Sequence, residues 1–208
     1  MKEISKHTLY RICQIYQVLE EMSMRHVQKI SSKELANILG FSADSIRKDI
    51  NSLGNLGNFG AKYDIAALMN FISGRLDMSA KKKVCIVGIG RMGSAIFNYE
   101  LLLGSNYEIV AGFDSNINKI ETMTSNIPLY PAFRIPEVVM EKHIELGVIT
   151  VPSKDAQSTA ERLEKGGIKG IVNMTGSPIT VGENIYVTNI DVLKELRYLS
   201  SLIGLNNI

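Results

Sequence analysis

The sequence predicts an α/β protein in which an N-terminal winged-helix domain precedes a doubly wound parallel sheet of the Rossmann type and a C-terminal helix. Three observations predict this class. Up to about residue 78, apolar residues recur at intervals of three and four, as in amphipathic helices. From Lys83 onward, short apolar runs alternate with helical stretches. A final apolar helix follows, from about Ile190 to Ile203. The expected boundaries are 1–78, 79–188 and 189–208.

Composition excludes several classes of protein. Hydrophobic residues make up 45% and charged residues 21% of the 208 residues, which is ordinary for a folded globular chain. No apolar run approaches the ~20 residues that span a bilayer, and no secretory signal is recognisable. Cys13 and Cys85 lack the spacing of a zinc module or a disulfide scaffold. We therefore expect no metal and a cytoplasmic location.

The N-terminal part carries the signals of a helix-turn-helix. A first helix has its apolar face at Leu9, Ile12, Cys13, Tyr16, Leu19 and Met22. Ser31 and Glu34 form a capping box that opens a second helix, and Gly40 is placed to end it in a left-handed conformation. Ser42 caps a third helix, whose apolar side is Ile46, Ile50 and Leu53. Two short helices joined by a tight turn are typical of DNA-binding domains.

Two further segments complete this part. Residues 54–63 contain three glycines in ten, which predicts a tight hairpin, the wing after the third helix. Asp64 then caps another helix. The segment Gly74 to Lys83, which ends in three lysines, is the expected linker between the two domains.

Four apolar runs predict the strands of the sheet, at 84–87, 109–113, 147–151 and 170–172. The first leads directly into Gly88-Ile89-Gly90-Arg91-Met92-Gly93, which opens a helix. In this motif Gly88 allows the tight turn, Gly90 lets the backbone approach a pyrophosphate, and Gly93 lets helix and strand pack closely. Amide groups at the helix start then hold the anion. The motif predicts a dinucleotide site.

An acid ends the next strand, 21 residues after Gly93. Asp114 would accept hydrogen bonds from a ribose diol and repel a 2′-phosphate, so NAD(H) is favoured over NADP(H). Thr150, Val151 and Pro152 end a third strand at the edge where ligands bind. Three alternatives stay open: a glycine-rich turn without a nucleotide, Asp114 as a simple cap, and Pro152 as no more than a helix start.

The sequence contains no motif that supports an enzymatic function. None of the three histidines follows a strand end on the cofactor side, and no Tyr-x-x-x-Lys pair or Gly-x-Ser-x-Gly motif exists. Only some 20 residues follow the nucleotide domain, too few for a substrate domain. A binding protein is therefore favoured over an oxidoreductase.

The third helix would read DNA through polar side chains that flank the buried Ile46. Arg47 could bind a guanine edge or a phosphate, and Lys48 a phosphate, with Ser45 beside them. The alternative is an ordinary surface Arg-Lys pair.

Taken together, these motifs resemble the Rex family of redox-sensing transcriptional repressors over nearly the whole chain. The matching segments are 31–35, 46–50, 88–95, 113–114, 150–152 with 156–157, 167–171 and 189–191. The resemblance implies a homodimer that binds operator DNA with NAD+ and releases it with NADH. It also implies that the last helix swaps across the dimer to lie between the partner's domains.

The resemblance adds residues to both sites. Asn173, Tyr99 and Asp191 join the cofactor side, and Ser31, Phe59 and Lys62 join the DNA side, the last two in the wing.

The sequence also departs from the family pattern. Family members usually carry an arginine at the position of Gln17, taken to pair with Tyr99 and with Asp191 of the other subunit; glutamine allows only a neutral hydrogen bond there. A basic wing residue is usual near Phe59, and the usual Asn-Phe-Ala-Pro stretch reads Asn173-Met174-Thr175-Gly176.

Three alternatives to this reading remain. One is an NAD-dependent oxidoreductase with an N-terminal oligomerisation domain. Another is a repressor whose second domain binds a CoA derivative or nothing. The last helix, whose apolar face is too broad for a free surface helix, could also pack on its own domain.

Overall fold

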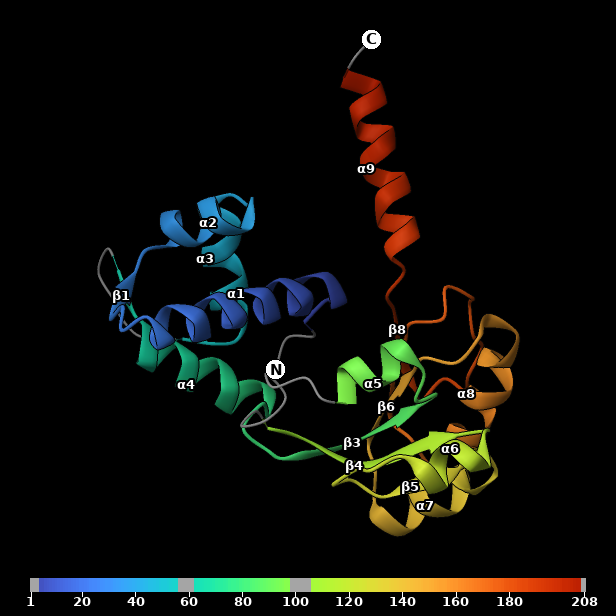
Figure 1. The fold of residues 1–208 in the computed structure, drawn as a ribbon. Helices are drawn as coiled ribbons and strands as arrows, with labels where there is room; N and C mark the ends of the chain where they lie inside the picture. The colour runs from blue at the N-terminus through green and yellow to red at the C-terminus, as the bar shows by residue number, and fades with distance from the viewer. Residues whose placement is uncertain (1–3, 56–61, 98–105, 207–208) are drawn as a thin grey trace. The chain divides into compact units, whose positions relative to one another are not determined.

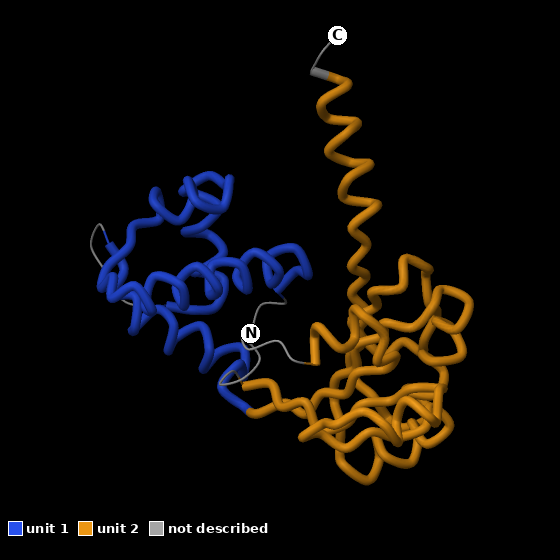
Figure 2. Tube along the Cα trace, in the orientation of Figure 1, with its two compact units in different colours: residues 1–80 blue, residues 81–208 orange. Residues whose placement is uncertain are grey.

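A computed structural model describes residues 4–55, 62–97 and 106–206. The chain divides into two compact units, residues 1–80 and residues 81–208 (Figure 2). Each unit has its own hydrophobic core.

Unit 1 is built from short helices and one two-stranded ladder (Figure 1). Its elements are α1 (Lys6–Met24), β1 (Lys29–Ile30), α2 (Ser32–Leu39), α3 (Ala43–Ser52), β2 (Tyr63–Asp64) and α4 (Ile65–Leu76).

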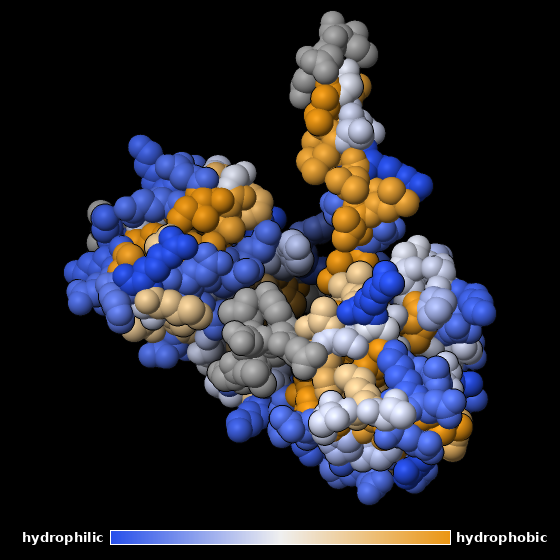
Figure 3. Space-filling model, in the orientation of Figure 1, coloured by the Kyte–Doolittle hydropathy of each residue, from blue (hydrophilic) through white to orange (hydrophobic). Residues whose placement is uncertain are grey.

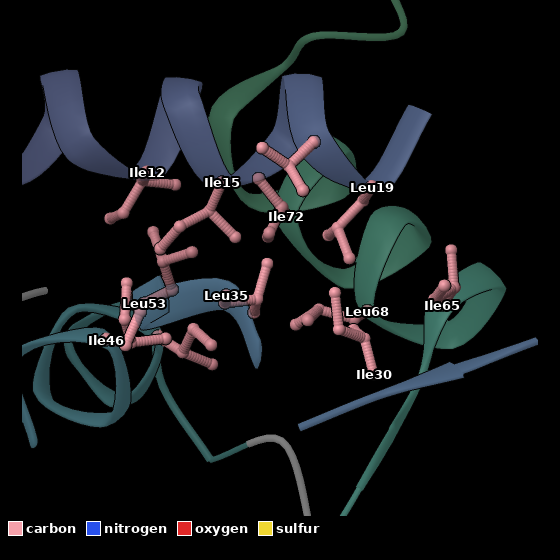
Figure 4. Packing of buried hydrophobic residues seen from close by; sticks show 13 residues of the cluster. Ile12, Ile15, Leu19, Ile30, Leu35, Ile46, Leu53, Ile65, Leu68 and Ile72 are labelled. Carbon is pink, nitrogen blue, oxygen red and sulfur yellow. The ribbon is translucent and has the colours of Figure 1, made fainter. Parts of the chain in front are cut away.

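The core of unit 1 is dominated by isoleucine and leucine from all four helices (Figure 4). On α1 the buried residues are Ile12, Ile15, Val18 and Leu19. The predicted apolar face was therefore partly wrong, because Leu9 and Cys13 are exposed. These two residues lie four apart and form a second apolar stripe that unit 1 does not cover.

The predicted caps of the helix-turn-helix are confirmed. The Ser31 hydroxyl accepts from the backbone N–H of Glu34 at 3.1 Å, and the Glu34 carboxylate accepts from the Ser31 N–H at 2.7 Å. These bonds and the neighbouring Lys62 ammonium lower the pKa of Glu34 to about 2. Gly40 ends α2 with φ +72°, and the Ser42 hydroxyl accepts from Ser45 N at the start of α3.

The wing and the linker differ from expectation. Tyr63–Asp64 pairs with Lys29–Ile30, before α2, so the described ladder is not a hairpin within 54–63; residues 56–61 lie outside the described part. The predicted linker was too long. Helix α4 continues to Leu76, where Asp77 adopts a left-handed cap, and strand β3 begins at Lys82.

One buried ion pair fixes α3 on α1. Two guanidinium nitrogens of Arg11 donate to the two carboxylate oxygens of Asp49, both at 2.7 Å. The Asp49 side chain is only 4% exposed and that of Arg11 is 30% exposed. Because Arg11 belongs to α1 and Asp49 to α3, the pair fixes the position of α3 relative to α1.

Unit 2 is a doubly wound domain followed by a helix (Figure 1). Its strands are β3 (Lys82–Val87), β4 (Tyr107–Asp114), β5 (Leu129–Pro131), β6 (Leu146–Ile149), β7 (Gly170–Asn173) and β8 (Tyr186–Asn189). Its described helices are α5 (Arg91–Phe97), α6 (Ile117–Thr122), η2 (Ala132–Arg134), α7 (Ile135–Lys142), η3 (Ser153–Asp155), α8 (Ala156–Lys165) and α9 (Val192–Asn206).

All six strands are parallel, in the order β5-β4-β3-β6-β7-β8. The predicted fold class is confirmed. The connection reverses direction between β3 and β6, which lie side by side, and this switch point opens a crevice at the carboxyl ends of the strands.

Alternate residues of β3 enter separate cores. Cys85 and Val87 face the layer that contains α7 and α8, whereas Ile86 faces the layer that contains Phe97 of α5. This two-sided burial explains the uninterrupted apolar run in the sequence. In the described residues, no helix is long and apolar enough to cross a membrane.

Breaking the Arg11–Asp49 pair should destabilise unit 1. We expect Arg11→Met to cost about 3 kcal/mol of unfolding free energy, because Asp49 remains buried without its cation. Urea denaturation followed by the helical circular dichroism signal measures this loss. Arg47→Met, which removes an exposed pair with Asp44 from the same unit, should leave the midpoint nearly unchanged. Equal small effects of both substitutions would show that Asp49 is solvated.

Candidate nucleotide site and DNA-reading helix

The glycine loop lies at the switch point, between the end of β3 and the start of α5. Gly88 has φ +95°, and a Cβ there would lie 2.9 Å from atoms of Thr150 and Val151. A Cβ on Gly93 would lie 2.0 Å from the carbonyl oxygen of Gly88. Both positions therefore require glycine for reasons internal to the fold.

Gly90 is different, because nothing lies within 4 Å of a Cβ built there. Its φ does not demand glycine either. The residue is exposed and faces open space beside the loop. Neither packing nor backbone geometry therefore explains why residue 90 is glycine. The absence of a side chain fits a position where a ligand approaches the backbone.

Thr150 joins the glycine loop to the neighbouring strand. Its hydroxyl lies 2.6 Å from the carbonyl oxygen of Gly88 and 3.1 Å from that of Val87, and donates to them. Its backbone N–H also donates to Val87 O at 2.8 Å. The Thr150 side chain thus fixes the glycine loop to the end of β6. Val151 and Pro152 follow it and line the crevice.

Asp114 ends β4 next to the loop. One carboxylate oxygen accepts from the N–H of Ile89 at 3.0 Å, and the other accepts from the N–H of Asn116 at 2.9 Å. The Lys119 ammonium lies 3.2 Å from the first oxygen. Asp114 is thus a cap for its own loop. Three of the four acceptor positions of its carboxylate are used in this way, and one remains for a ligand.

A cavity of about 370 Å³ connects these groups. Its walls come from β3, β4 and β6 at their carboxyl ends and from one face of α8: Val87, Gly88, Gly90, Asp114, Ser115, Ala132, Thr150, Val151, Pro152, Asp155, Ser158, Thr159 and Arg162. The volume falls in the range of small-molecule sites. An open backbone position, a carboxylate and apolar walls fit the pyrophosphate, ribose and base of a dinucleotide.

The sequence did not identify the α8 wall. Asp155, Ser158 and Arg162 repeat at three and four residues on the helix that follows a cofactor-side strand, and this spacing was the available signal.

The other residues of the motif take different positions. The side chain of Ile89 is buried in the core, so only its backbone belongs to the site. Arg91 and Met92 are exposed in the first turn of α5. Tyr99 lies outside the described residues.

Asn173 and Asp191 line a second cavity of about 220 Å³ at the ends of β7 and β8. The Asn173 amide donates to Ser177 O and to the Asn189 side chain, and its oxygen accepts from Thr175. Asp191 caps α9 by accepting from the N–H groups of Leu193 and Lys194. These internal bonds indicate that Asn173 shapes the loop; a direct cofactor contact by either residue stays a prediction.

The predicted DNA-binding residues gather around α3. The Arg47 guanidinium donates to the Ser32 hydroxyl at 2.9 Å and pairs with Asp44, yet its side chain remains 49% exposed. Lys48 is exposed, and no ion pair engages it within the described chain. Ser45 shares a hydrogen bond with Ser42.

Of the remaining residues on the DNA side, Lys62 and Ser31 have structural partners. Lys62 pairs with Glu34 at 3.2 Å. Ser31 serves the capping box described above. Phe59 lies outside the described residues.

Comparisons with known proteins extend over the entire chain. The profile of a putative DNA-binding protein N-terminus matches residues 3–51, and that of a CoA binding domain matches residues 79–176. A "Redox-sensing transcriptional repressor Rex" of Limosilactobacillus reuteri (strain DSM 20016) is 33% identical over 198 residues, covering 95% of this chain and 92% of that protein. The chain belongs to the Rex family of redox-sensing transcriptional repressors.

Solved structures agree with this assignment. RSP, a Rex-family repressor, has been crystallised with beta-NADH (TM-score 0.86, 25% identity, 100% of this chain and 97% of that chain). It has also been crystallised with beta-NAD+ and operator DNA (TM-score 0.88, 26% identity, 100% and 95%). The prediction of a Rex-type transcriptional repressor rather than an enzyme is confirmed.

The open space at Gly90 allows a substitution that affects nucleotide binding without affecting folding. Gly90→Ala should leave the melting temperature unchanged, because its methyl group meets no protein atom, and should weaken NADH binding at least tenfold, because the methyl group occupies the approach to the pyrophosphate. Calorimetry and thermal unfolding measure the two effects. Gly93→Ala is the matched control and should impair folding itself. Unchanged NADH affinity in Gly90→Ala would place the pyrophosphate elsewhere.

Proposed function

We propose that this Rex-family protein binds operator DNA through α3 when it is free or carries NAD+, and releases the DNA when NADH occupies the cavity beside Gly90 and Asp114. The single observation that carries this proposal is the open approach to the Gly90 backbone at the switch point of the sheet, in a chain that also contains a capped helix-turn-helix. The crystallised complexes of RSP with NADH, NAD+ and operator DNA support it.

Within this function the chain has three parts. Residues 1–78 read DNA, residues 79–188 hold the dinucleotide, and residues 189–208 carry the helix α9, which swaps between two subunits. The dimer acts in the cytoplasm. The support for the swap is α9, on which every residue from Val192 to Leu205 is exposed. Figure 3 displays this apolar surface; its large side chains include Val192, Leu193, Leu196, Leu199, Leu202 and Ile203.

The apolar face of α9 needs a partner, because a helix with so broad an apolar surface gains stability only by burying it. In the described structure the chain's own sheet does not cover it, which disfavours packing on its own domain. A second copy of the chain supplies a matching surface. Leu9, Tyr10 and Cys13 of α1 are exposed, and Gln17 continues the same side of that helix.

NAD(H) fits the first cavity better than nucleotides with an additional ribose phosphate. The Asp114 carboxylate would repel a 2′- or 3′-phosphate, as in NADPH or CoA. Lys119 offsets part of this charge, and the matching CoA binding profile keeps CoA as the second candidate. Thermal-shift measurements with NADH, NADPH and CoA separate the three ligands.

The two cysteines do not explain redox sensing. Burial raises the pKa of the Cys85 thiol to about 12, so this thiol stays protonated and unreactive. Cys13 belongs to the other compact unit, and partial burial raises the pKa of its thiol as well. The redox signal is therefore assigned to the nucleotide.

The switch requires that NADH and NAD+ bind the two states of the protein unequally. The two cofactors differ in the charge and planarity of the nicotinamide ring. The second cavity, at Asn173 and Asp191, lies at the ends of β7 and β8, where the nicotinamide half would extend from the glycine loop. A rearrangement about residues 77–81 would then change the spacing of the two α3 helices of a dimer, which must match one DNA turn of ~34 Å.

The release of DNA by NADH is directly measurable. A duplex selected from a random library by the NAD+-bound protein serves as operator. We expect added NADH to lower the affinity for this duplex at least tenfold in fluorescence anisotropy, whereas added NAD+ leaves it unchanged. The affinity should also fall steeply with salt, since phosphate contacts release counterions. Operator binding that is indifferent to NADH would refute the proposed switch.

Substitutions of Arg47 and Lys48 should affect DNA binding in different ways. We expect Arg47→Ala to lower operator affinity ten- to a hundredfold and to reduce the preference over random DNA, because a base contact contributes roughly 1–3 kcal/mol. Lys48→Ala should weaken specific and random DNA equally, as a phosphate contact does. Competition anisotropy with both duplexes measures this, and NADH affinity should stay unchanged in both variants. A uniform loss in Arg47→Ala would show that Arg47 contacts phosphate only.

A further inference from the structure

The first cavity extends beyond the groups that a pyrophosphate and a ribose would occupy. Past Asp114 it is bounded by Ser115 and by Ala132 at the end of β5, and its opposite wall is α8. Asp155, the N-cap of α8, and Arg162 mark the two ends of that wall. They are seven positions apart, or roughly 10 Å along the helix axis, so the cavity follows most of α8.

Arg162 is the cation on this wall, and it has no protein partner in the described parts of the chain. Its side chain is half-buried. Arg11, Arg47 and Arg134 each pair with a carboxylate, whereas no ion pair joins Arg162 to Asp155 or to another carboxylate among the described residues. The Arg162 guanidinium therefore keeps its donors available for a ligand in the cavity that supplies acceptors.

The order of groups along the cavity identifies the ligand moiety. With the pyrophosphate at Gly90 and the ribose diol at Asp114, the base is the part that reaches the α8 wall. A purine is flat and neutral, and its ring nitrogens are acceptors. A guanidinium is flat and carries only donors, so it can both stack on a purine and donate to its edge. Val151 and Ala132, which are only partly buried, supply the apolar contacts that a purine also needs.

We propose that Arg162 is a specificity-determining residue of the nucleotide site, which contacts the adenine base through its planar guanidinium. This inference rests on the proposed function, because it assumes that the cavity holds a dinucleotide in the stated direction. It places the adenine end of the ligand against α8. This helix belongs neither to the glycine motif nor to β4, which ends with Asp114.

Two substitutions at one position test the contact. Arg162→Met keeps the length of the side chain and removes its charge and donors. We expect it to weaken NADH about tenfold in calorimetry and to weaken ADP-ribose, which retains the adenosine half, by the same factor. Arg162→Lys keeps the charge but loses the planar group, and should remain as weak as Arg162→Met. Saturating NADH should still release operator DNA from both variants, at about tenfold higher concentration.

Lys165→Met is the matched control, because it removes a cation from the exposed side of the same helix and should change neither affinity. The inference is overturned if Arg162→Met binds NADH and ADP-ribose as the unaltered protein does, if only NADH is weakened, or if lysine restores full affinity. A lower melting temperature of Arg162→Met with loss of operator binding would also overturn it, since Arg162 would then support the fold. If the unaltered protein itself fails to bind NADH, the proposed function fails instead.

Discussion

The contact between the helix start at Gly93 and the turn at Gly88 is the constraint on which the nucleotide site depends. A side chain at Gly93 would overlap the Gly88 carbonyl, so the first turn of α5 can approach the end of β3 only because residue 93 is glycine. The same carbonyl accepts the Thr150 hydroxyl, which ties the loop to the end of β6 across the switch point. The glycine loop and the end of β6, which are distant in sequence, therefore meet at one backbone group.

A second feature of the molecule is that its polar residues mostly hold the scaffold in shape. Asn173 is buried and uses both its amide and its oxygen within the protein. Asp114 and Asp191 cap loops and helix starts, and Ser31 caps α2. Side chains fixed in this way present a rigid surface, which reduces the entropy lost on binding. The groups left for ligands are the Gly90 backbone, one acceptor position of Asp114, and cations such as Lys48 and Arg162, which pair with no carboxylate among the described residues.

The sequence predicted the parts of the structure that local chemistry determines. The capping box at Ser31 and the left-handed Gly40 depend on neighbouring residues only. The glycine loop could be predicted from its local spacing, although Thr150, from a distant strand, also holds it. The face of α1 was harder, because Leu9 and Cys13 match the helical period as well as Ile12 does, and only packing decides which stripe is buried. Arg162, which lines the first cavity, was missed because that cavity is formed by elements that are distant in sequence. The strands β5 and β8 were missed because neither contains a buried apolar run: β5 is only partly buried, and β8 is mostly exposed.

The coupling between DNA and nucleotide must be carried by few elements. The described residues that line the first cavity all belong to unit 2, whereas α3 belongs to unit 1, so no side chain serves both sites. Any influence of NADH on α3 therefore has to be transmitted from one unit to the other. Linkage also requires reciprocity: if NADH weakens DNA binding by a given factor, DNA weakens NADH binding by the same factor. Gln17 is neutral, so no charge at this position can bias the equilibrium. In the proposed switch, the differential binding then has to arise at the nicotinamide end of the site and in the burial of α9 against a partner subunit.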